Sequence, residues 1–147
     1  MIEKTLANAD FIKLMQKNCY EILHFLTKEN TEFSIVVNPK FVDFDPALPS
    51  HLDLSKEPFT RFVLGGYTFD SIVLNEKSIC FHAGFGPDDF ATFVNVDLGA
   101  ITQIIVNDAV IFINFSFYTR KKDTQALAQN SKNIFLNNPK NKEKFKK

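Results

Sequence analysis

The chain of 147 residues contains no tryptophan, only two cysteines and no long apolar run. Cys19 and Cys80 lack the spacing of metal ligands, and they predict a reduced, cytoplasmic protein. No segment is apolar over enough length to span a membrane, and residues 1–10 lack the basic leader and apolar run of a signal peptide. Seventeen phenylalanines predict an aromatic interior, in a chain long enough for one domain with appendages.

The net charge of zero hides a division of charge along the chain. Residues 1–116 carry 8 Lys and Arg against 15 Asp and Glu, a net charge of −7, whereas residues 117–147 carry 9 against 2, a net charge of +7. An acidic body repels phosphates, so nucleic acid is an unexpected partner for the folded part. The change in composition predicts a folded domain over residues 1–117 and a flexible, disordered basic tail over residues 118–147.

One amphipathic helix is predicted over residues 10–29. Its apolar side chains recur at helical spacing at Phe11, Met15, Cys19, Ile22 and Leu26, and four more widen the stripe. Such a wide stripe is compatible with two interpretations: the whole stripe is core, or part of it contacts a dimer partner.

Short strands follow this helix. They are predicted over residues 32–38, 61–67, 69–75, 78–85, 90–96, 101–106 and 109–115, with a single helical turn at 97–100. Residues 40–60 are rich in proline, and they predict an irregular segment that covers a sheet face. The pattern indicates an α+β, mainly β fold with a small, partly open antiparallel barrel.

The strand over residues 78–85 is the first candidate for a binding site. Ile79, Phe81, Ala83 and Phe85 alternate with more polar positions, and Gly84 leaves the backbone bare for close approach by another chain. An extended peptide can pair along such a strand while pockets hold its side chains. The alternative is that the apolar residues are simply core.

No residue pattern favours catalysis, a metal or a cofactor. His82 and Cys80 share a strand face, but no third ligand is spaced nearby, so a structural role is the better interpretation. The glycine pair at residues 65–66 lacks the helix and lysine of a phosphate loop. We therefore expect a binding protein without enzymatic activity.

Three segments occur in an order typical of one family. They are Phe62-Val63-Leu64, the run ICFHAGFG over residues 79–86, and the run VNVDLGAI over residues 94–101. Together they resemble the stringent starvation protein B (SspB) family, the substrate adaptors of the ClpXP protease. Pro87 and Asp97 stand where the family has glycine and proline.

The resemblance implies an N-terminal helix on an Sm-like open barrel, and a homodimer formed through that helix. It implies that the tmRNA-encoded (ssrA) degradation tag of stalled nascent chains binds in an apolar groove, with Ala83 as the small groove residue. The predicted peptide-binding residues are Phe81, His82, Ala83, Phe85 and Gly86. The terminal Phe145-Lys146-Lys147 resembles the motif that docks on the N-terminal domain of ClpX. The alternatives are an Sm-like RNA-binding protein and a structural or regulatory subunit that does not bind the tag.

Overall fold

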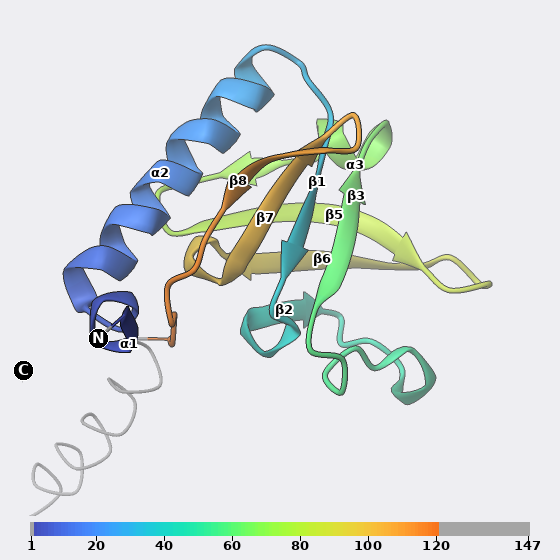
Figure 1. Cartoon of the computed structure of the whole chain (residues 1–147). Coiled ribbons are helices and arrows are strands. Elements are labelled where there is room, and N and C mark those ends of the chain that lie inside the picture. The colour runs from blue at the N-terminus through green and yellow to red at the C-terminus, as the bar shows by residue number, and fades with distance from the viewer. Residues whose placement is uncertain (1, 121–147) are drawn as a thin grey trace, which may run out of the picture.

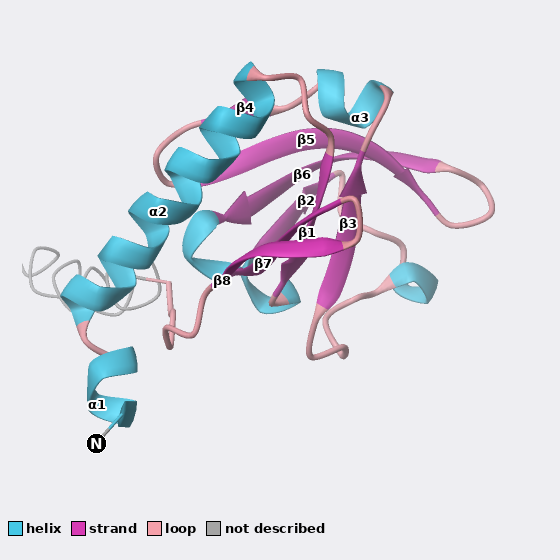
Figure 2. Cartoon of the chain, turned by 45° about the horizontal axis from the view of Figure 1, so that its top comes forward, coloured by secondary structure: helices cyan, strands magenta, loops and turns pink. Residues whose placement is uncertain are grey.

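The structure is a computed structural model, and it describes residues 2–120. It shows an α+β fold in which strands predominate and form two antiparallel four-stranded sheets (Figures 1 and 2). This confirms the predicted fold class at that level. Within the described range, no helix is both long and apolar enough to cross a membrane.

Two helices precede the strands. Helix α1 spans Ile2–Leu6, and α2 spans Ala9–Lys28, which confirms the helix predicted over residues 10–29. The side chain of Asn8 caps α2 by accepting two backbone hydrogen bonds from its first turn. Helix α2 lies along one side of the sheets (Figure 1), and its fully buried side chains are Cys19, Leu23 and Leu26.

The first sheet has the strand order β3-β1-β7-β8. Its strands are β1 at Phe33–Val37, β3 at Thr60–Leu64, β7 at Ile101–Val106 and β8 at Ala109–Ile113. Strands β7 and β8 form the predicted hairpin, whose turn residues Asn107 and Asp108 both have positive φ. Asparagine and aspartate tolerate this left-handed conformation better than other non-glycine residues do.

The second sheet has the strand order β2-β6-β5-β4. Its strands are β2 at Val42–Asp45, β4 at Val73–Leu74, β5 at Ser78–Phe85 and β6 at Phe90–Asp97. Strands β5 and β6 were both predicted, and they pair with each other over their full lengths. Their hairpin projects beyond the rest of the domain (Figures 1 and 2).

Short helical turns occupy several connections. They are η1 at Pro39–Phe41, η2 at Ser50–Leu52, α3 at Tyr67–Asp70 and η3 at Leu98–Ala100. The last of these confirms the helical turn predicted at residues 97–100.

Two of the predicted strands were partly wrong. The strand predicted over residues 61–67 ends at Leu64, because Gly66 has a φ of 56° and turns the chain into α3. The strand predicted over residues 69–75 is reduced to Val73–Leu74. Strand β2 was missed, since it lies in the segment expected to be irregular.

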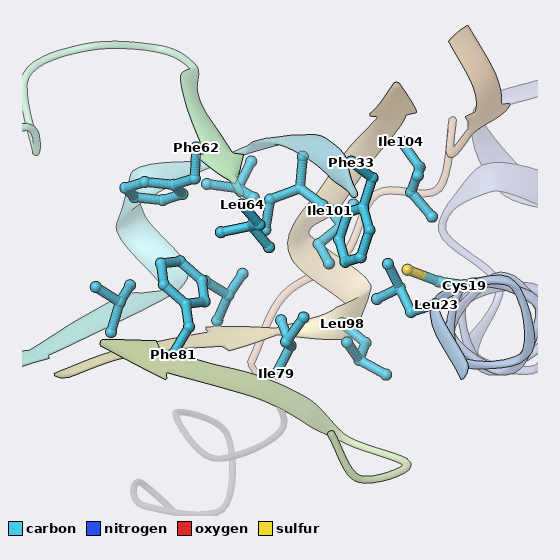
Figure 3. Close-up of a cluster of buried hydrophobic side chains, with 14 of the residues drawn as sticks. Cys19, Leu23, Phe33, Phe62, Leu64, Ile79, Phe81, Leu98, Ile101 and Ile104 are labelled. Carbon is cyan, nitrogen blue, oxygen red and sulfur yellow. The ribbon is translucent and has the colours of Figure 1, made fainter. Parts of the chain in front are cut away.

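The core lies between the facing sheets and is closed on one side by α2 (Figure 3). Phe81 of β5 meets Phe62 of β3 edge to face, with ring centroids 5.5 Å apart. Cys19 and Leu23 enter from the helix. Phenylalanine rings therefore make part of the contact between the two sheets.

The folded part extends further than predicted, because residues 118–120 are attached to the second sheet. The Arg120 guanidinium donates to Asp97 at 2.7 Å and to Asp43 at 2.8 Å. Tyr118 donates to Asp97 at 2.8 Å, and its ring lies against Gly99. We call these four residues, Asp43, Asp97, Tyr118 and Arg120, the C-terminal clasp. Residues 118–120, which were predicted to belong to the tail, thus contact the second sheet.

Candidate functional site

Strand β5 has two faces with different environments. Ile79 and Phe81 are buried in the core, while His82 and Gly84 point to the outer face of the second sheet. The same alternation in β6 buries Val94 and turns Phe93 outward. Apart from α3 at one edge, no helix of the described residues covers this outer face (Figure 2).

Three rings form a cluster on the outer face, and we call Tyr67, His82 and Phe93 the outer aromatic cluster. His82 and Phe93 are cross-strand partners whose ring centroids lie 4.6 Å apart. Tyr67 reaches over from α3, and its hydroxyl lies 3.0 Å from His82 Nδ1. Tyr67 is 68% exposed and Phe93 is 56% exposed. Contiguous exposed aromatic surface of this kind marks an interaction site more often than an isolated apolar residue does.

The backbone of β5 is only partly paired beside this cluster, because Ser71 Oγ bonds both the N–H and the C=O of His82 and no strand continues beyond it. Strand β4 pairs only with Ile79 and Cys80, so the rest of β5 has no strand neighbour on that side. The His82 N–H points to this free side and donates to Ser71 Oγ at 2.8 Å. Backbone groups of an antiparallel ladder alternate in direction, so Gly84 N–H and C=O point the same way as those of His82. An extended peptide can therefore pair with β5 at Gly84 and lie next to the outer aromatic cluster.

The predicted peptide-binding residues are divided between two faces and a turn. His82 belongs to the outer aromatic cluster. Phe81 is 1% exposed, which corresponds to the core alternative, and it cannot contact a ligand in this conformation. Ala83 and Phe85 are half-buried on the inner side, where they pack against the core. Gly86 lies in the turn with a φ of 74°, next to Leu52.

A small cavity of about 300 Å³ lies near the inner residues. Phe44 lines this cavity and packs edge to face against Phe85, with ring centroids 5.8 Å apart. Leu48 and Leu54, from the irregular segment over residues 46–59, also line it. Ala83 itself packs against the core, so a larger side chain in a variant such as Ala83→Gln reports on folding as well as on binding.

Tyr67 and Phe93 were not predicted from the sequence as site residues. Side chains in residues 90–96 alternate between the two faces of the strand, so Phe93 points to the face opposite that of the apolar Val94. Pairing across the hairpin, Phe85 with Phe90, then sets His82 against Phe93. Register was therefore the signal that could have found Phe93, whereas α3, which carries Tyr67, was predicted to be strand.

The C-terminal clasp lies at the other end of the outer face. Burial alone would lower the pKa of Arg120, but its hydrogen bonds and Coulombic attraction to Asp97 and Asp43 outweigh burial, so the pKa is raised. The clasp charges are therefore paired with one another. Arg120 also lies over the ring of Phe41, 5.8 Å from its centroid.

A second apolar surface lies between α2 and β8, away from the outer face. It is a groove of about 680 Å³, lined by Met15, Ile22, Phe25, Ile111 and Ile113 among others. Phe25 is 60% exposed there. The residues of α2 that line this groove belong to the wide apolar stripe, and the core does not cover them fully.

The described residues contain no group of three or more His, Cys, Asp or Glu side chains arranged to hold a metal ion. Burial raises the pKa of the Cys19 thiol and, to a smaller extent, that of Cys80. The predicted docking motif, Phe145-Lys146-Lys147, lies outside the described residues.

We find no match between the chain and any model of a known protein family or any curated protein sequence. The functional interpretation therefore depends on the residues and the geometry described above.

Proposed function

We propose that the protein is a non-enzymatic, cytoplasmic substrate adaptor that binds the ssrA degradation tag of stalled-translation products and delivers them to ClpXP. The observation that carries the proposal is the outer aromatic cluster beside the edge of β5 at Gly84, where no strand of the described residues pairs with it. The choice of tag and protease comes from the ordered sequence segments that resemble the SspB family. One of these segments forms all of β5 except Ser78, and another forms the second half of β6, the strand that carries Phe93.

Peptide binding would combine two contributions. Backbone hydrogen bonds to the free side of β5 give affinity that does not depend on the peptide side chains, and contact with Tyr67, His82 and Phe93 gives selectivity for an apolar residue. The two facing sheets would correspond to the partly open Sm-like barrel of the family.

Delivery would use the tail after the C-terminal clasp. Residues 121–147 are 27 residues, for which the fully extended length is at most about 97 Å. The terminal Phe145-Lys146-Lys147 would dock on the N-terminal domain of ClpX. Tethering raises the local concentration of substrate at the protease. The contact with the tag and the contact with ClpX can therefore each be weak and still allow delivery.

Dimerisation would use α2, as the resemblance implies. Phe25 on the helix and Ile111 and Ile113 on β8 form an apolar surface that the described residues leave open. A homodimer would bury this surface and place two peptide sites on one complex. Size-exclusion chromatography with light scattering tests this: the wild type should elute as a dimer and Phe25→Glu as a monomer. A monomeric wild type at about 100 µM, where any dimer would be weaker than roughly −5.5 kcal/mol, would contradict it.

Fluorescence polarisation with a labelled tag peptide tests the adaptor function. We expect the wild type to bind the tag but not a scrambled peptide, and Tyr67→Ala to bind at least several-fold more weakly. The matched control is Val63→Ala, because Val63 is 70% exposed but lies on β3 of the other sheet. If the wild type shows no binding up to about 100 µM, or roughly −5.5 kcal/mol, the adaptor function is excluded.

A deletion of residues 145–147 distinguishes an adaptor from a structural or regulatory subunit that does not bind the tag. The deleted protein should bind the tag with unchanged affinity but should no longer accelerate ClpXP degradation of a tagged substrate. Unchanged acceleration would show that the terminus is not the docking motif.

A further inference from the structure

We propose that strand β8 pairs edge to edge with the β8 of a second copy of this chain. The two strands lie antiparallel across a twofold axis, and they join the first sheets of both copies into one continuous sheet. The inference rests on the dimerisation proposed above and adds the backbone that forms the dimer. It follows from the free edge of β8, from the composition of that edge and from the apolar surface around it.

One side of β8 has no partner strand. Strand β8 is the last strand of the first sheet and pairs only with β7. The two-residue turn at 107–108, with positive φ at both positions, makes Val106 and Ala109 the hydrogen-bonded pair that closes the hairpin. Because the direction of the backbone groups alternates along the ladder, the N–H and C=O of Val110 point away from β7.

The far end of β8 has a second free position. Asn114 N–H donates to Thr102 O at 2.9 Å, so the N–H and C=O of the preceding Ile113 point away from β7. No hydrogen bond of the outward groups of Val110 or Ile113 with another described residue is found. Free N–H and C=O groups in a row are a template for another strand.

The two edge strands of the first sheet differ in composition. Strand β3 carries Arg61, whereas β8 has the sequence AVIFI, without charge or proline. Native proteins commonly protect an exposed edge strand with a charged side chain or a proline, since an unprotected edge pairs with other chains. In β8 the register shift between Ile104 and Ile105 of its partner strand is the device of this kind that the ladder contains. The composition of β8 is therefore typical of an edge that is covered.

The apolar surface around β8 is close to the size that a stable dimer needs. Strand β8 and the residues after it run beside α2 (Figure 1), and large side chains there are 46–66% exposed: Leu14, Phe25, Ile111, Ile113, Phe115 and Phe117. At about half of roughly 200 Å² for each side chain, these six expose about 600 Å². A standard interface buries about 800 Å² per partner, so this surface supplies most of that area.

A second copy is the occupant that fits both the edge and the surface. Antiparallel pairing of a strand with itself is symmetric, so one apolar edge supplies both halves of the interface. The twofold axis is perpendicular to the joined sheet, and the α2 helices of both copies therefore lie on its inner face, where Cys19 and Leu23 pack (Figure 3). A dimer formed by α2 alone leaves the outward groups of Val110 and Ile113 in water.

Cysteine crosslinking and amide exchange of the full chain test the inference. The variant Ile111→Cys places a thiol at the centre of β8, where antiparallel pairing brings it close to its counterpart. The control is Val63→Cys, because Val63 is 70% exposed on the other edge strand of the same sheet. The wild type, with its two native cysteines, gives the background. Exchange of the Val110 and Ile113 amides is measured by NMR at protein concentrations below and above the dissociation constant of the dimer.

We expect Ile111→Cys to form a disulfide-linked dimer about tenfold faster than Val63→Cys under mild oxidation. The Val110 and Ile113 amides of the wild type should exchange more slowly as the protein concentration rises, and those of Phe25→Glu should not. A dimer that lacks both effects would overturn the inference and leave dimerisation through α2 standing. Slow exchange in a monomer would show that another part of the same chain covers the edge, which also overturns it. A wild type without any dimer would exclude both the inference and the proposed dimerisation, while tag binding tests the adaptor function separately.

Discussion

Phe81 and Phe93 lie on neighbouring strands of one hairpin, and they have opposite environments. Phe81 is 1% exposed and packs against the facing sheet, whereas Phe93 is 56% exposed on the outer face. Burial of the first ring stabilises the fold, while exposure of the second gains nothing for the fold and leaves a surface for a ligand. The inner face of the second sheet thus stabilises the fold, whereas the outer face is exposed and is the face to which we assign binding in our proposal.

The largest effect should come from Phe81→Ala, which leaves a cavity between the sheets. We expect a loss of about 3–5 kcal/mol in the free energy of unfolding, measured by urea denaturation. A loss below about 1 kcal/mol would show that Phe81 is not packed as described and would return it to the list of candidate ligand contacts.

The next largest should come from Arg120→Ala, which leaves the partly buried Asp97 carboxylate without its charged partner. We expect the free energy of unfolding to fall by about 1–3 kcal/mol, while tag binding at the other end of the outer face stays unchanged. Lys56→Ala serves as the control, because no ion pair of Lys56 with a described residue is found. Equal stability of the two variants would mean that the clasp does not hold the chain.

Phe93→Ala, in contrast to Phe81→Ala, should lower tag affinity and leave the free energy of unfolding nearly unchanged. The free energy of unfolding should change by less than about 0.5 kcal/mol, because the ring is largely in solvent. Tag affinity should fall about tenfold, or roughly 1.4 kcal/mol, measured by fluorescence polarisation. A stable variant with wild-type affinity would remove the outer aromatic cluster from the binding site.

The smallest effect is a difference in cysteine reactivity. Cys80 is half-buried next to Val73 on the outer face, whereas Cys19 is fully buried in α2. Because burial raises the pKa of both thiols, alkylation should be slow at neutral pH and faster as the pH rises. Mass spectrometry should find Cys80 modified first and slowed a few-fold by bound peptide. Modification of Cys19 in the native state at a similar rate would contradict the assignment of the faces.

The sequence predicted the elements in which local pattern and tertiary packing agree. Period-two alternation with a Gly-Pro-Asp-Asp turn specified the β5–β6 hairpin, and the 3.6-residue stripe specified α2. Strand β2 was missed because it is a short edge strand between prolines, and it exists through its pairing with β6. Residues 67–70 have side chains typical of strands, but Phe69 packs on Phe33 from a helical turn.

The site was predicted in part for a similar reason. Strand β5 and its free glycine were identified from residue pattern alone, but the cluster around His82 is formed by segments 15 and 11 residues away in sequence. The C-terminal clasp joins residues 77 and 23 positions apart, within a basic run whose composition is typical of disorder. Contacts of this range depend on register and topology, which composition does not encode.

The most direct test of the central claim is an NMR titration of the ¹⁵N-labelled chain with the tag peptide. We predict that amide shifts will concentrate at His82, Gly84 and Phe93, and that exchange of the Gly84 amide with solvent will slow as it pairs with the peptide. Residues of the groove between α2 and β8, such as Phe25 and Ile111, should not respond. Shifts confined to that groove, or unchanged spectra at saturating peptide, would contradict the assignment of the outer face as the binding site.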